Sequence, residues 1–136
     1  MESKQKRTAL VTGGSSGIGR CTVAALSKAG YIVYEFSRRD VPVEGVRHMR
    51  VDVTDEASVQ EAVGQILLER ESIEILVNCA GFGISGAVEF TESEQAKAQF
   101  NVNFFGTVNV SRAVLPSMRR QHRKELRTNL CGGCEV

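Results

Sequence analysis

A short apolar run passes into a helical segment through Thr12-Gly13-Gly14-Ser15-Ser16-Gly17-Ile18-Gly19. Gly13 can turn the chain sharply, Gly17 lets the backbone approach a pyrophosphate, and Gly19 lets the helix pack against the strand. The helix start adds free N–H groups and a positive dipole end. Many glycine-rich turns bind nothing, but the position of this turn between a strand and a helix predicts a dinucleotide phosphate site.

Strand-like and helix-like segments alternate along the chain. Apolar or β-branched runs predict strands at residues 8–12, 31–37, 46–53 and 73–77. Helical spacing predicts helices at 17–29 and 56–70, the second capped by Thr54 or Asp55, and a short helix running into a long one over 91–120. Because such alternation produces right-handed crossovers between parallel strands, we expect an α/β fold. It would be a Rossmann-type parallel sheet of order 3-2-1-4 covered by helices, an incomplete doubly wound fold.

The second predicted strand ends in Ser37-Arg38-Arg39. In a dinucleotide site an acidic residue here binds the 2′-hydroxyl of NAD, whereas an arginine accommodates the 2′-phosphate of NADP. Both arginines could instead be solvated loop charges. After the glycine turn we favour phosphate binding and NADP(H) as the cofactor, with Arg38 the better candidate because it lies closer to the strand end.

Three further motifs follow the glycine turn in the order Asp52-Val53, Asn78-Cys79-Ala80-Gly81 and Asn103-Phe104-Phe105-Gly106. In this order and spacing the four motifs together resemble the classical short-chain dehydrogenase/reductase family. The resemblance covers about residues 6–121, and the glycine spacing differs from that of the extended branch of the family.

The resemblance implies contacts with the adenosine and phosphate groups of the cofactor. Asp52 would accept a hydrogen bond from the adenine amino group, beside the Val53 backbone. The alternative is that Asp52 only caps a helix or ends a strand. Ser15, Ser16 and Ile18 would contact the phosphates through hydroxyl or backbone N–H groups.

The segment after the fourth strand has implied roles as well. Asn78, Ala80 and Gly81 would hold this strand against the first, with Thr12 bonding across to them, and would lie along the cofactor. Asn103 resembles the helix asparagine whose backbone carbonyl holds a water in the proton relay of the family. Alternatively, it is a polar residue within a packed helix, as we expect of residue 101.

The chain lacks the Tyr and Lys, four residues apart, with which the family transfers a proton. Its only tyrosines, Tyr31 and Tyr34, lie in the second predicted strand, and neither has a lysine at that spacing. The resemblance ends after Gln121, where we find no strand pattern. We therefore expect a partial NADP(H)-binding domain at 1–121 and an atypical tail at 122–136, the product of a truncation or frameshift.

A missing fifth strand would leave residues 73–77 as an exposed apolar edge. The long helix would also keep apolar side chains with few partners, among them Phe105, Val108, Leu115 and Met118. From these two features we expect a homo-oligomer or an aggregation-prone product.

The composition restricts the partners. With a formal net charge of +1 the chain has no field that attracts nucleic acid or a membrane, and no apolar run is long enough for a membrane span or a signal peptide. We expect a cytoplasmic protein with reduced cysteines, Cys21 and Cys79 in the core, no metal site, and no role for Cys131 and Cys134. The basic residues at 119–127 favour a cationic helix end over a nucleic-acid site.

Two functions remain open. The first is the cofactor-binding part of an oxidoreductase that transfers hydride between NADP(H) and a carbonyl or alcohol, inactive in this form and able to act on a small-molecule substrate only if the missing half is supplied. The second is a non-catalytic dinucleotide-binding sensor or interaction module. The loss of family character within the domain favours the first.

Overall fold

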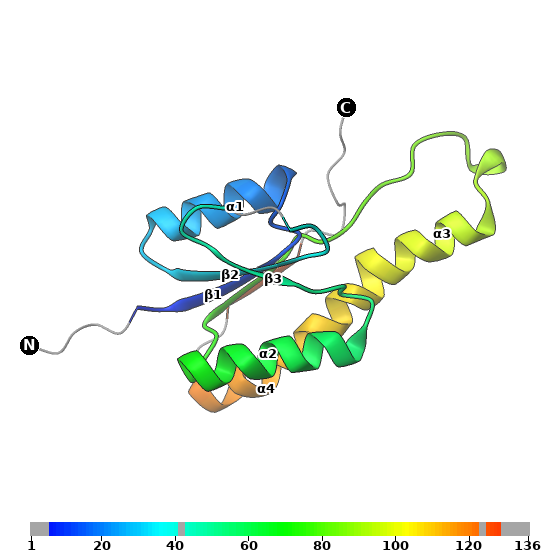
Figure 1. Ribbon diagram of the computed structural model, residues 1–136. Helices are drawn as coiled ribbons and strands as arrows, with labels where there is room; N and C mark the ends of the chain where they lie inside the picture. The colour runs from blue at the N-terminus through cyan, green and yellow to red at the C-terminus, as the bar shows by residue number, and fades with distance from the viewer. Residues whose placement is uncertain (1–5, 41–42, 123–124, 129–136) are drawn as a thin grey trace, which may run out of the picture.

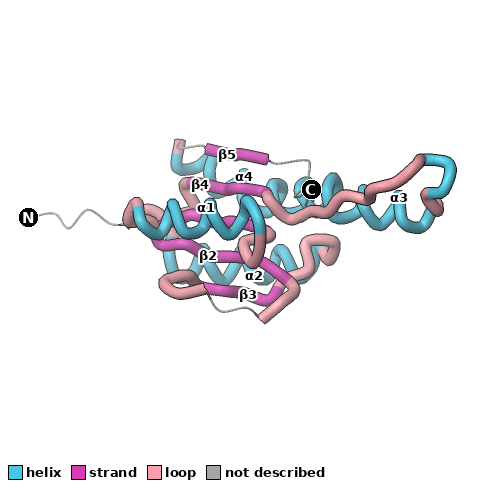
Figure 2. Tube along the Cα trace, turned by 90° about the horizontal axis from the view of Figure 1, so that it is seen from above, coloured by secondary structure: helices cyan, strands magenta, loops and turns pink. Residues whose placement is uncertain are grey.

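The computed structural model describes residues 6–40, 43–122 and 125–128 of the chain. Five parallel strands form one sheet of order β3-β2-β1-β4-β5, and Figure 2 views this sheet from the side that α1 covers. The strands are β1 (Thr8–Thr12), β2 (Ile32–Ser37), β3 (Arg47–Arg50), β4 (Ile75–Asn78) and β5 (Glu125–Thr128). The helices are α1 (Gly17–Lys28), α2 (Glu56–Arg70), η1 (Val88–Phe90), α3 (Ser93–Phe100), η2 (Asn101–Gly106) and α4 (Thr107–Gln121), where η2 is a π-helical turn. The predicted Rossmann-type α/β sheet, with strands in the order 3-2-1-4, is confirmed.

Helices cover both faces of the sheet, α1 on one and α2 with α4 on the other (Figure 1). The face under α1 buries Ala9, Val11 and Val33 of the strands against Val23. The opposite face is larger and packs Leu10, Phe36 and Leu76 of the strands against α2 and α4. Side chains of a strand alternate between two apolar faces, which explains the nearly continuous apolar runs in the sequence.

The start of α2 is set by a capping side chain. The helix begins after Asp55, whose carboxylate accepts a hydrogen bond from the backbone N–H of Ser58 at 3.2 Å. This satisfies one of the free donors of the first turn, so of the two predicted caps Asp55 is the one used. The observed helix covers the predicted range 56–70.

The expectation that no strand follows Gln121 is wrong. Helix α4 ends at His122, which has a left-handed φ of 53°, and β5 then lies parallel to β4. Residues 73–77 therefore do not form an exposed edge within the described chain. The strand was missed because it is short and partly charged. An edge strand receives its backbone hydrogen bonds from its neighbour whatever its side chains are, and edges commonly carry charges.

Two expectations about side-chain burial are also wrong. Cys21 is exposed, because the buried stripe of α1 runs through Gly19 and Val23. Because Gly19 has no apolar side chain, the pattern of apolar residues in the sequence did not mark it as part of the buried face of α1. Met118 is fully buried with Val110 of the same helix and does not lack partners. Phe105, by contrast, is 54% exposed, as expected.

The segment from η1 to η2 projects from the end of the sheet at which the parallel strands finish (Figures 1 and 2). It carries several large apolar side chains that are exposed, namely Val88, Phe90, Phe100, Phe104 and Phe105. Among the residues that the structure describes, none of the helices has the length and hydropathy of a membrane span.

Candidate functional site

A cavity of about 570 Å³ lies at the carboxyl ends of β1, β2 and β4. Open parallel sheets bind ligands at this end. Of the cofactor-binding residues predicted from the sequence, the structure brings to this cavity Gly13, Ser15, Ser16, Gly17, Ile18, Gly19, Arg38, Asp52, Val53, Ala80 and Gly81. Asn78 is not among the residues that line it.

The glycine-rich turn forms one wall. The N–H of Gly13 donates to the carbonyl of Phe36 at 2.8 Å, and its φ of +68° is a conformation that favours glycine. A Cβ at this position would lie 2.7 Å from the backbone N and Cα of Ala80. The turn therefore packs directly on the segment after β4, which no larger residue would allow.

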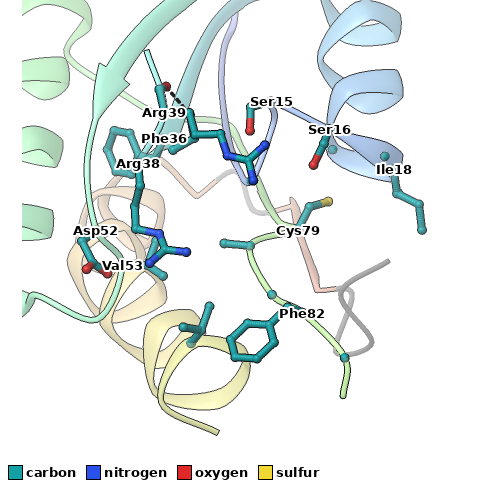
Figure 3. A pocket seen from close by; sticks show the side chains of 18 of the residues that line it. Ser15, Ser16, Ile18, Phe36, Arg38, Arg39, Asp52, Val53, Cys79 and Phe82 are labelled. Carbon is teal, nitrogen blue, oxygen red and sulfur yellow. Dashed lines mark hydrogen bonds between the residues drawn. The ribbon is translucent and has the colours of Figure 1, made fainter. Parts of the chain in front are cut away.

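The N-terminus of α1 opens onto this wall. The helix has no side-chain hydrogen bond at its cap, Ser16, and no acidic residue in its first turn. Its first N–H groups and dipole are thus available to an anion. Figure 3 shows Ser15, Ser16 and Ile18 around this end of the cavity, where the predicted phosphate contacts require them.

Thr12 connects the two central strands at the cavity. Its hydroxyl oxygen accepts hydrogen bonds from the backbone N–H groups of Cys79 at 3.2 Å and Ala80 at 3.1 Å. The cross-strand bonding expected of Thr12 is present. Asn78 is buried, and its amide donates to the hydroxyls of Ser111 at 3.3 Å and Thr128 at 3.4 Å. Asn78 therefore ties β4 to α4 and β5 and does not line the cavity.

The opposite wall carries positive charge. Figure 3 shows Arg38 on the side of Asp52 and Arg39 on the side of Ser15. Asp52 accepts hydrogen bonds from the Thr54 backbone N–H at 3.0 Å and from its hydroxyl at 2.7 Å. Burial opposes the ionisation of Asp52, but these bonds and the charge of Arg38 outweigh it, so that the pKa of Asp52 lies below its ordinary value. The site thus holds a carboxylate and an arginine side by side.

Asn103 lies in the π-helical turn η2 and fixes the loop after β4. Its side chain accepts a hydrogen bond from the Phe82 N–H at 2.9 Å and donates to the Phe82 carbonyl at 2.8 Å. Its own backbone carbonyl accepts a hydrogen bond from the Thr107 hydroxyl at 2.9 Å. The side chain of Asn103 therefore positions Phe82, which lines the cavity. Residue 101 is exposed.

Comparison with known proteins identifies the family. The sequence profile described as short chain dehydrogenase matches residues 7–125, most of this chain. The chain belongs to the short-chain dehydrogenase family. The 3-ketodihydrosphingosine reductase of Bacteroides thetaiotaomicron is 46% identical to this chain over 123 residues, which are 90% of this chain and 46% of that protein.

Solved structures agree with this assignment. A short-chain dehydrogenase from Streptomyces avermitilis superposes with a TM-score of 0.84 at 30% identity, over 91% of this chain and 48% of that one. ElxO with NADP bound superposes with a TM-score of 0.82 at 26% identity, over 89% of this chain and 54% of that one. The chain spans about half the length of the relatives that it matches.

The cavity also contains residues that were not the preferred candidates from the sequence. Phe36 and Cys79 line it, and so does Arg39, which the sequence ranked behind Arg38. Phe36 lies two residues before Arg38 at the end of β2, and Cys79 lies between Asn78 and Ala80, so proximity to predicted residues was the available signal. Burial raises the pKa of the Cys79 thiol, with a hydrogen bond to Thr22 as a smaller opposing effect, so Cys79 is a packed neutral group.

The structure describes no cluster of three or more His, Cys, Asp or Glu side chains that could hold a metal ion within residues 6–40, 43–122 and 125–128. The predicted lack of a role for Cys131 and Cys134 falls on residues outside this description.

Proposed function

We propose that residues 1–136 form the NADP(H)-binding part of an oxidoreductase that transfers hydride between NADP(H) and a carbonyl or alcohol group. One observation carries this proposal. The glycine-rich turn, the start of α1, Arg38 and Asp52 line a single cavity at the carboxyl ends of the strands. The phosphates would lie against the N-terminus of α1, and the adenine beside Asp52 and Val53.

The charge of the cavity supports NADP(H) over NAD(H). Arg38 and Arg39 both line it at the end of β2, where a 2′-phosphate would lie, and guanidinium groups bind phosphate through charge-assisted hydrogen bonds. The related ElxO structure contains NADP. The Asp52 carboxylate accepts hydrogen bonds from Thr54 and interacts with the charge of Arg38. Its single negative charge offsets only one of the two arginine charges on this wall.

The reaction itself needs groups beyond those in the cavity. Tyr34 is buried and hydrogen-bonded to Glu69 at 2.5 Å and to Arg47 at 2.8 Å, and neither Tyr31 nor Tyr34 lines the cavity. We therefore propose that residues 1–136 alone bind the cofactor without turning over a substrate, with Asn103 as the member of the proton relay that they contain. The relative named as a 3-ketodihydrosphingosine reductase favours a ketone as the substrate of the complete enzyme.

The test is a fluorescence titration of the purified chain with NADPH and NADH. We expect NADPH to bind about ten- to a hundredfold more tightly, because a hydrogen bond to a charged group contributes roughly 1.5–3 kcal/mol. Arg38→Asp should weaken or reverse this preference. Arg112→Asp makes the same charge change at an exposed residue of α4 that does not line the cavity, and should leave the ratio unchanged. Equal affinities for NADPH and NADH in the wild-type chain would contradict the proposal, and a preference that Arg38→Asp leaves unchanged would remove Arg38 from its role.

A further inference from the structure

Gly14 differs from its neighbours in the direction it faces. Residues 13–19 all belong to the described part of the chain. Within this stretch, every residue except Gly14 lines the cavity. Its N–H points to the other side and donates to the carboxylate of Glu35 at 3.1 Å. The turn therefore has a front that faces the cavity and a back that is held by β2.

Glu35 is a fully buried carboxylate in the middle of the sheet. A buried charge is costly unless it is paired or hydrogen-bonded, so its partners are required for the side chain to be there at all. The contact with the turn is also close-packed, because a Cβ at Gly14 would lie 2.4 Å from Cγ of Glu35 and 2.8 Å from Cγ2 of Val23. The turn thus rests on the Glu35 side chain both by hydrogen bonding and by shape.

The second oxygen of Glu35 reaches across the sheet. It lies 2.6 Å from Nδ1 of His48 on β3, and Nε2 of His48 lies 3.4 Å from a carboxylate oxygen of Asp40, close but outside hydrogen-bond geometry. Asp40 follows Arg38 and Arg39 in the loop after β2. Because this last contact is not a hydrogen bond, Glu35 is coupled directly to the glycine-rich turn and only weakly to the loop that carries the arginines.

We infer that Glu35 is a positioning residue for the pyrophosphate of the dinucleotide, an inference that rests on the proposed function. The carboxylate fixes the back of the turn through Gly14, and this fixes the N–H groups of the front in the direction of the cavity. A turn held in its binding conformation before the ligand arrives loses less conformational freedom on binding. Glu35 itself does not line the cavity and acts through the turn.

The experiment compares two substitutions and two ligands. Glu35→Met keeps the length of the side chain and removes the acceptor, whereas Glu35→Gln keeps an acceptor oxygen. Each variant is titrated with NADPH, which contains the pyrophosphate, and with adenosine 2′-monophosphate, which has only the adenosine end. Glu61→Met, at an exposed position of α2, is the matched control.

We expect Glu35→Met to weaken NADPH binding by about tenfold, the usual size of a lost hydrogen bond to a charged group. Its affinity for adenosine 2′-monophosphate should not change, and Glu35→Gln should restore most of the NADPH affinity. Equal losses for both ligands would mean a general structural role and would overturn the inference, as would a Gln variant as weak as the Met variant. A wild-type chain that binds neither NADPH nor adenosine 2′-monophosphate would instead overturn the proposed function.

The contact can also be measured without a ligand, in case Glu35→Met does not fold. The amide resonance of Gly14 in ¹⁵N–¹H spectra should move upfield in Glu35→Gln, because a neutral amide is a weaker acceptor than a carboxylate. The same resonance should stay in place in Glu61→Met. A Gly14 resonance unaffected by Glu35→Gln would show that the carboxylate does not hold the turn and would overturn the inference.

Discussion

The glycine-rich turn after β1 and the projecting segment from η1 to η2 differ in how closely they are packed. At Gly13 even one added carbon would lie within 2.8 Å of the backbone of the next segment. In the projection, Phe90 is 80% exposed and Phe100 is 64% exposed. The backbone of the first region is packed against its neighbours with no room for a side chain at Gly13, whereas the second region exposes large side chains to solvent. Substitutions should therefore change the free energy of unfolding far more in the turn and the residues that pack against it than in the projecting segment.

The largest difference is expected between two phenylalanines. Phe36 is fully buried at the end of β2, beside the turn, and Phe100 is mostly exposed at the end of α3. Phe36→Ala should lower the free energy of unfolding by about 3–5 kcal/mol, because it leaves a cavity in the core. Phe100→Ala should change it by less than about 0.5 kcal/mol. Urea denaturation measures both, and similar losses at the two positions would refute the contrast.

A smaller effect of opposite sign is expected for two glycines in helices. A Cβ at Gly19 would lie 2.1 Å from the carbonyl oxygen of Gly13, whereas at Gly64 in α2 it would meet no atom within 4 Å. Gly19→Ala should therefore destabilise the protein by roughly 1–3 kcal/mol through overpacking. Gly64→Ala should stabilise it by about 0.5–1 kcal/mol, since alanine loses less entropy in a helix. Thermal unfolding distinguishes the two, and a stabilising Gly19→Ala would contradict the packing described.

The smallest effect concerns the junction between the two regions. Asn103 in η2 holds the backbone of Phe82 by two hydrogen bonds, whereas residue 101 in the same turn is exposed. Asn103→Ala should loosen this loop by about 1 kcal/mol, or roughly fivefold faster amide exchange at Phe82. Asn101→Ala should leave that exchange rate unchanged. An unaltered rate in Asn103→Ala would mean that the side chain does not hold the loop.

The strongest local signals in the sequence predicted the fold well. The bounds of β1 and α2 are as expected, since one is a buried apolar run and the other begins at a capping Asp55. The alternation with helices indicated parallel strands, and the Rossmann-type unit indicated by the glycine turn and the family resemblance gave the order of the first four. Strand β5 could not be predicted in this way, because its pairing depends on the turn at His122 and on the free edge of β4. A short edge strand carries little hydrophobic pattern of its own.

The candidate site was predictable to a similar degree. The residues at the strand ends could be placed because parallel strands finish at the same edge of a sheet. Asn78 and Glu35 show the limit of this reasoning. Whether a strand residue faces the cavity or the interior depends on the pleat and on partners from distant segments, such as Ser111 for Asn78 and His48 for Glu35. Neither partner can be identified from spacing along the chain.

The position of the dinucleotide site can be measured directly by mapping the NADPH contacts of the wild-type chain with ¹⁵N–¹H NMR. If this cavity binds the dinucleotide, chemical-shift changes will gather at residues 13–19, Arg38, Asp52 and Ala80, with little change between Val88 and Phe100. Shifts centred on the projecting segment, or none at saturating NADPH, would contradict the assignment of this cavity as the dinucleotide site.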